Sequence, residues 1–472
     1  MSLLASLLRT RAASTGRAEA ACRLRHLHLS DRPLMLIALN RTGPAARPLA
    51  VMLGTDPCRP QLHTAPPSGS NAPTLAALAQ TVIAYIDTCR HTGDAPQILV
   101  PNPKSVEYLK ELGDDLRLRR TNEMPGSRAI QRLGHWFTYL TDRADIPGAA
   151  ALIAMTDFLG MHWITGQSPL EDEDLATLLA WIDPPRQAAS GREAADQAEA
   201  SATYRPPGPA TDAAFDNYEL APLLQADARG QDQTSVLQAL HSLLARYMQP
   251  TWDLMWHAYA LLQTVPEAPS TARRWDQERT AFADECTYLA QDGRPRPAHE
   301  QAVATAVRLA TMEHADTLFA AERAADDPFV RAELRTSGQA FAGPVITVDT
   351  QHLRRGLTGR ALWRPRLTVS TRDPVLMEPG QLLACHTHRN ARYKISEITP
   401  STDATVVELE ITAGMGTVAR PNDTVLPEPG TQLVFTLAPD YYRMPEFPTR
   451  AQTPWTHGGP PPEHPNENGD GE

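Results

Sequence analysis

A basic and aromatic stretch in the last third of the sequence has the residue types that bind a phosphate backbone. Nine basic residues lie between positions 354 and 394, against two acidic ones, Asp373 and Glu378. Arginine stays charged and forks onto phosphate oxygens, while aromatic rings stack on bases. The residues predicted to contact nucleic acid are Arg354, Arg355, Arg360, Trp363, Arg364, Arg366, Arg372, Arg389, Arg392, Tyr393 and Lys394. The alternative is a solvated strand face, or arginines that pair with the acidic helical region.

A second basic stretch precedes three aromatic residues. It consists of Arg117, Arg119, Arg120, Arg128 and Arg132, followed by Trp136, Phe137 and Tyr139. The two basic stretches would line one groove if their faces met. The three aromatic residues stand where a helix needs core side chains, so we favour core packing for them.

Histidines and carboxylates occur in three small sets that suit zinc or iron. His386 and His388 alternate on an expected strand with Cys385 on its other face; the remaining sets are Asp253 with His257, and Glu313 with His314. None reaches three ligands without tertiary contact. We therefore predict no metal site and no cofactor. A metal-dependent hydrolase or nuclease assembled from these dispersed residues is the first alternative function.

The local sequence signatures of common enzymes are missing. The chain has no Gly-rich phosphate loop ending in Lys-Ser/Thr, no G-x-S-x-G, no H-E-x-x-H and no C-x-x-C. The catalytic residues stay unassigned, and these absences favour a protein without a catalytic site of its own.

Composition indicates the source of the protein and the compartment in which it works. Of 44 basic residues all but Lys104, Lys110 and Lys394 are arginines, which is typical of GC-rich bacterial genes, and the net charge is −11. Five dispersed cysteines fit a reducing cytoplasm. No run of 18 apolar residues occurs, which excludes a spanning helix and a membrane partner. The first 30 residues resemble an organellar transit peptide in composition, although we favour a basic helical segment of a bacterial cytoplasmic protein.

Patterning predicts an α+β multidomain chain with an N-terminal α/β domain, a central helical bundle and a small C-terminal antiparallel β-barrel. The expected divisions are a basic N-terminal segment (1–32), the α/β domain (33–185), a disordered linker (186–214), the helical bundle (215–340), the β-barrel (341–445) and a disordered tail (446–472).

Within the α/β domain the expected elements are a hairpin of 34–39 with 49–53, a helix over 75–86 stopped by Gly93, a strand at 98–100 and a helix capped by Ser105 that ends at Gly113. The acidic run 171–174 fits the first turn of a helix with a capping box between Ser168 and Glu171 better than it fits a metal cluster.

The bundle is expected to have four amphipathic helices, and Pro250 is expected to end the first of them. The expected barrel strands are 345–348, 366–370, 381–385, 392–398, 405–411 and 431–436.

These patterns together predict an accessory protein associated with DNA or RNA, in which the barrel contacts phosphate and the acidic bundle binds a protein partner such as a motor or nuclease. The second alternative is a structural scaffold for protein–protein interaction.

Overall fold

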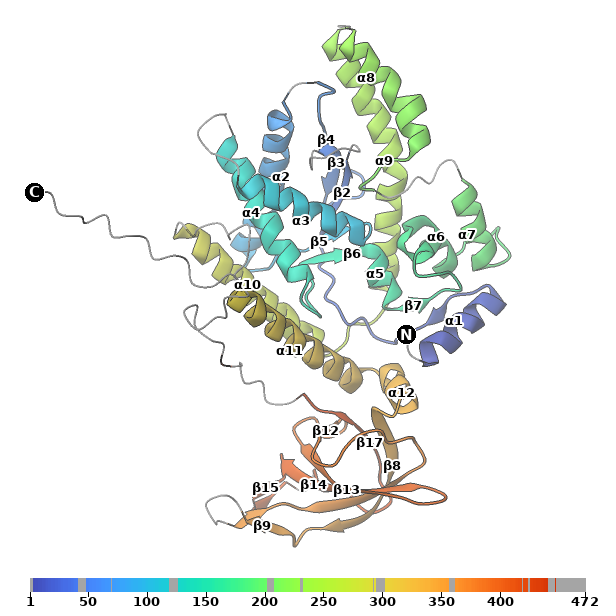
Figure 1. The fold of residues 1–472 in the computed structure, drawn as a ribbon, viewed down its shortest axis with the longest axis vertical. Helices are drawn as coiled ribbons and strands as arrows, with labels where there is room; N and C mark the ends of the chain where they lie inside the picture. The colour runs from blue at the N-terminus through green and yellow to red at the C-terminus, as the bar shows by residue number, and fades with distance from the viewer. Residues whose placement is uncertain are drawn as a thin grey trace, which may run out of the picture.

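The structure has two separate hydrophobic cores. The computed structural model describes residues 3–40, 48–68, 70–118, 126–201, 208–229, 232–291, 293, 302–355, 361–417, 419–422, 425–439 and 446. One core extends from Leu27 to Cys286, and the other from Phe341 to Phe435. The chain is therefore α+β and multidomain, with a barrel at one end of the molecule (Figure 1).

The first core is built around a mixed five-stranded sheet with the order β4-β3-β2-β5-β6. Its strands are β2 (Leu34–Asn40), β3 (Pro48–Gly54), β4 (Gln61–Thr64), β5 (Ile98–Val100) and β6 (Leu152–Ala154). Strands β2 and β3 pair antiparallel as the predicted hairpin, and β5 and β6 continue parallel to β2. All seven residues of β3 are buried because both faces of the sheet are covered.

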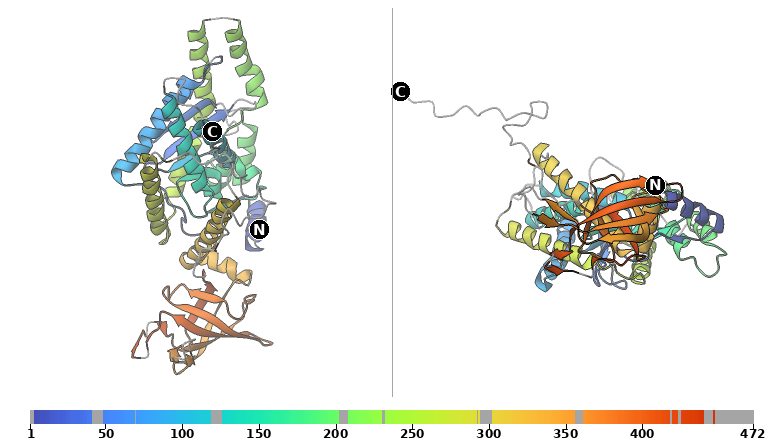
Figure 2. Two further views of the ribbon diagram at one scale, coloured as in Figure 1. Left: turned by 60° about the vertical axis from the view of Figure 1, so that its left-hand side comes forward. Right: turned by 90° about the horizontal axis from the view of Figure 1, so that it is seen from below.

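Helices cover both faces of this sheet (Figure 2). The helices on one side are α2 (Ala72–Thr92), α3 (Pro103–Arg117) and α4 (Ser127–Ala144). On the other side α9 (Gln233–Gln263) contacts β2, β3 and β4. Gly93 caps α2 in the left-handed conformation, as predicted. Asn102, not Ser105, caps α3, and this helix continues through Gly113.

The remaining elements that precede the second core lie outside this five-stranded sheet. They are α1 (Leu3–Thr15), β1 (Glu19–Ala20), α5 (Met155–Gly160), β7 (Trp163–Ile164), the 3₁₀ turn η1 (Glu171–Glu173), α6 (Leu175–Ile182), α7 (Gly191–Ala200), the π-helical η2 (Phe215–Leu220), α8 (Ala221–Ala228), α10 (Thr271–Ala290), α11 (Ala302–Asp326) and α12 (Pro328–Thr336). Ser168 and Glu171 form the predicted capping box, although it closes η1 while Asp174 caps α6.

Two expectations about the middle of the chain are corrected. Helix α9 runs unbroken through Pro250, and its buried face shares one core with the sheet, so α9 and α10 do not form a separate bundle. The segment expected to be a disordered linker contains α7, whose Ala194, Ala195 and Ala198 are buried. Alanine side chains are small enough to let α7 approach α6 closely, and this contact needs no large apolar residue.

The second core fills a closed antiparallel barrel with the order β11-β14-β13-β12-β17-β8. Its strands are β8 (Ala340–Asp349), β11 (Arg366–Thr371), β12 (Leu382–Cys385), β13 (Arg392–Pro400), β14 (Thr405–Ala413) and β17 (Gln432–Leu437), and each overlaps a predicted segment. Two small hairpins join β9 (Leu353–Arg355) with β10 (Ala361–Trp363) and β15 (Gly416–Thr417) with β16 (Arg420–Pro421). The expected tail lies outside the described residues beyond Glu446.

Candidate functional site

The barrel does not present all the aromatic residues predicted to stack on bases. Tyr393 alternates into the barrel core, where it is completely buried and its hydroxyl lies 3.0 Å from Nδ1 of His388. It cannot stack on a base, and its assignment to the nucleic-acid contact is corrected. Trp363 is half-buried and donates from Nε1 to the carbonyl of Thr350. Arg360 lies outside the described residues.

Acidic residues from neighbouring strands offset the basic stretch. Glu410 of β14 is directly opposite Lys394 of β13 and Arg366 of β11, and Arg366 is opposite Asp349 of β8. The Arg354 guanidinium also contacts Glu410, at 3.2 Å. Residues 341–445 contain eleven basic and ten acidic side chains, a net charge of +1. The excess seen over 354–394 therefore comes from the choice of window.

The other predicted barrel residues divide into tethered and exposed side chains. Arg389 forms an ion pair of 2.9 Å with Asp326 of α11, as the alternative of pairing with the helical region expects. Arg392 donates to backbone carbonyls, and Arg364 does the same. Arg355 and Arg372 are exposed and form no ion pair with any residue that the structure describes.

The second basic stretch lines a cavity of about 470 Å³ between α2, α3, α4 and α10. We call this cavity the arginine pocket. Its described lining comprises Arg90, Arg117, Arg128, Gln131, Arg132, His135, Trp136, Cys286, Leu289, Ala290 and Gly293. Four of these side chains are guanidinium groups, and none of those described is a carboxylate. Arg119 and Arg120 lie outside the described residues.

A close crossing of two helices positions these arginines. A Cβ on Gly134 of α4 would lie 2.3 Å from the backbone nitrogen of Arg117, so only glycine allows this approach. The crossing sets the end of α3 beside the first turns of α4, from which Arg128 and Arg132 project. Both arginines stand near the positive end of the α4 dipole, with no acidic residue in the first turn. This end of the helix favours an anion.

Ion pairs neutralise only part of the pocket. Arg132 pairs with Asp87 at 3.1 Å and Arg117 with Asp114 at 2.9 Å. Arg90 and Arg128 are exposed and form no ion pair within the described part of the chain. Burial raises the pKa of the Cys286 thiol; the nearby Arg90 and Arg132 act to lower it, and Asp87 and Glu285 act to raise it further.

The aromatic residues of this stretch serve the core, as predicted. Trp136, Phe137 and Tyr139 are all buried. The Nε1 of Trp136 is a buried donor without a hydrogen-bond partner among the described residues, and Trp136 also lines the pocket. Unpartnered buried donors are uncommon in proteins.

Two other cavities have different chemistry. One, of about 910 Å³, is lined by three arginines, two aspartates and one glutamate, so its charge is balanced. A cavity of about 530 Å³ lies where β2 and β5 end, at Asn40 and Asn102, the edge at which open α/β sheets bind ligands. Lys104 reaches Glu173 there at 3.1 Å.

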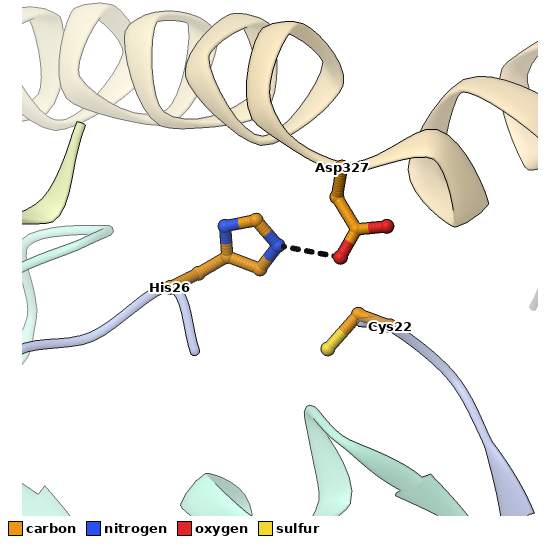
Figure 3. A group of neighbouring side chains, drawn as sticks. All are labelled: Cys22, His26 and Asp327. Carbon is orange, nitrogen blue, oxygen red and sulfur yellow. Dashed lines mark ion pairs between the residues drawn. The ribbon is translucent and has the colours of Figure 1, made fainter. Parts of the chain in front are cut away.

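The histidines and carboxylates proposed for a metal-dependent hydrolase do not form a cluster. His257 pairs with Asp183 at 2.9 Å, and Asp253 accepts from Gln249. His386 and His388 lie in a turn beyond β12, not on a strand. The described residues contain one group with three possible metal ligands, Cys22, His26 and Asp327, which sequence reasoning missed (Figure 3).

No known protein family, curated protein or solved structure matches this chain. Among the described helices, none has the length and apolar character needed to cross a membrane.

Proposed function

We propose that this protein is a nucleic-acid-associated accessory protein that holds a backbone phosphate in the arginine pocket. The observation that carries the proposal is a cavity with four arginines and no carboxylate in its described lining. Guanidinium groups bind phosphate through paired hydrogen bonds, and partial burial strengthens that attraction. The proposal moves the main contact from the barrel to the α/β domain.

The volume of the arginine pocket and its positively charged lining support a nucleotide unit as the ligand. Its volume of about 470 Å³ lies within the usual range of ligand pockets, roughly 300–1,000 Å³. The exposed Arg90 and Arg128 would meet the phosphate directly, since no ion pair within the described chain holds them. Arg355 and Arg372 on the barrel would provide a weaker second contact.

The proposal assigns catalysis to a partner, such as a motor or nuclease. What supports this part is that the sequence carries none of the local signatures of common enzymes.

The test is fluorescence anisotropy of the full-length protein with single- and double-stranded oligonucleotides over a range of salt concentrations. We expect binding that falls steeply with salt. The double variant Arg90→Gln, Arg128→Gln should bind at least tenfold more weakly and lower the salt slope by about 2, one unit for each lost phosphate contact.

The matched control is Arg355→Gln, Arg372→Gln, which removes the same charge from the barrel. If binding is lost only in this control variant, the phosphate contact lies on the barrel. Absence of binding at low salt would overturn the proposal. Free nucleotides and an unlabelled oligonucleotide should also be compared as competitors at equal phosphate concentration. If the two compete equally well, the pocket binds a small phosphorylated ligand instead.

A further inference from the structure

Cys22, His26 and Asp327 converge in the interior from distant parts of the chain (Figure 3). Cys22 and His26 lie between β1 and β2, and Asp327 lies between α11 and α12. His26 and Asp327 are completely buried, and Cys22 is 5% exposed. One possible ligand atom from each lies within 4.8 Å of the other two.

The contact between His26 and Asp327 has the wrong length for a good hydrogen bond. Nε2 of His26 lies 3.4 Å from Oδ2 of Asp327, whereas N–H···O bonds cluster between about 2.7 and 3.2 Å. Neither ring nitrogen of His26 has a hydrogen-bond partner among the described residues. Two ligands of one tetrahedral Zn²⁺, each about 2.1 Å from the ion, lie about 3.4 Å apart.

We propose that Cys22, His26 and Asp327 bind a Zn²⁺ ion that fastens the N-terminal segment to the junction of α11 and α12. Thiolate, imidazole and carboxylate are the three ligand types that zinc takes in proteins. The four-residue step from Cys22 to His26 is short enough for both to reach one ion. This site is independent of the phosphate contact.

Backbone hydrogen bonds already orient the carboxylate. Oδ2 of Asp327 accepts from the amides of Arg23 and Leu24, at 2.6 and 3.0 Å, and Oδ1 accepts from the amide of Phe329 at 2.8 Å. Burial opposes ionisation, but the hydrogen bonds from these amides, together with the nearby His26 ring, outweigh it and lower the pKa of Asp327 to about 2. Such outer contacts fix a metal ligand in place.

The Cys22 thiol is the ligand that must lose a proton when the ion binds. Burial, with the charge of Asp327, raises the pKa of Cys22 to about 12, so the metal-free thiol is protonated and points at the carbonyls of Leu24 and Met161. Zinc binding replaces the S–H bond with an S–Zn bond and releases one proton to solvent.

The three side chains leave the fourth position of a tetrahedral zinc site to a water molecule.

The experiment measures the metal content of the full-length protein from zinc-supplemented cells, then the spectrum after exchange with Co²⁺. We expect about one zinc per chain and, with cobalt, the thiolate-to-metal absorption and visible bands of a tetrahedral site. Cys22→Ser should abolish the thiolate absorption, and His26→Gln should weaken cobalt binding at least tenfold.

The matched control is Cys286→Ser, another buried thiol, which should keep both signals. A wild-type protein with no zinc and no cobalt spectrum would overturn the proposal, as would an unchanged thiolate band in Cys22→Ser. If Cys22→Ser fails to fold, the wild type still decides, because a chelator should lower its melting temperature while leaving that of Asp327→Asn unchanged.

Discussion

Asp327 shows how one buried carboxylate can join two distant segments of the chain. It caps α12 through the amide of Phe329 and accepts from two amides of the N-terminal segment. Charge-assisted hydrogen bonds of this kind are stronger than neutral ones. The contribution of Asp327 therefore depends on its being ionised.

This dependence predicts how stability changes with pH. The folded-state pKa of Asp327 is about 2, below the unfolded value of about 3.9, so its stabilisation is complete above about pH 5 and is lost as pH falls toward 2. The shift corresponds to about 2–3 kcal/mol. In chelator-treated protein, the gap in melting temperature between wild type and Asp327→Asn should narrow from pH 5 to pH 2.5. A gap that stays constant over this range would contradict the assignment.

The sequence could reveal only two of the three members of the cluster formed by Cys22, His26 and Asp327. A C-x₃-H spacing is visible at 22–26, but the third member lies about 300 residues further along the chain, and no local pattern connects them. Tyr393 illustrates the opposite error. Its position beside arginines predicts base stacking, whereas its alternation along β13 sends it into the barrel core.

At the scale of elements, the crossing of α3 and α4 depends on glycine in both helices. A Cβ added to Gly113 of α3 would lie 3.0 Å from the backbone nitrogen of Thr138. A Cβ added to Gly134 of α4 would lie 2.3 Å from the backbone nitrogen of Arg117. Glycine is otherwise unfavourable in a helix by about 1 kcal/mol relative to alanine. The close approach it permits brings the end of α3 to the arginine pocket.

Gly134→Ala should therefore destabilise the protein although alanine is the better helix former. The added methyl group overlaps the backbone of α3, and overpacking of this kind costs about 1–3 kcal/mol. Melting followed by circular dichroism measures the loss. Because the displaced segment carries Arg117, oligonucleotide affinity should fall as well. Gly160→Ala at the exposed end of α5 is the control, since nothing lies within 4 Å of its added Cβ. Equal melting temperatures for the two variants would contradict this account.

Element boundaries were predictable where one local rule applied. Short strand-like runs between turn signals predicted the barrel strands, and Gly93 predicted the end of α2. Pro250 misled because a proline within a long helix removes one hydrogen bond, and the buried face of α9, with Leu244, Met248 and Trp252, holds the helix together on both sides of it.

At the scale of the molecule, amphipathic patterns identified helices but not their partners. The apolar face of α9 has the same spacing whether it meets another helix or a sheet, so the sequence predicted a bundle where the structure has one core shared with β2, β3 and β4. The excess of positive charge expected for residues 354–394 was misjudged for a related reason. Acids such as Glu410 lie on strands outside the basic window but next to it in the barrel.

The separation of the two cores predicts two unfolding transitions. Contacts between them pass through α12 and through a few ion pairs such as Arg335 with Asp373 and Arg389 with Asp326, in which the arginines are exposed and the aspartates are not. Gly343→Ala tests this separation, because its Cβ would lie 1.9 Å from the carbonyl oxygen of Ser370 and force β8 from β11. Calorimetry should show two transitions, of which only the barrel transition moves to lower temperature. The helix signal in circular dichroism, which arises mainly from the first unit, should melt at the wild-type temperature. A single transition that shifts as a whole would mean that α12 couples the barrel to the α/β core more tightly than its few contacts suggest.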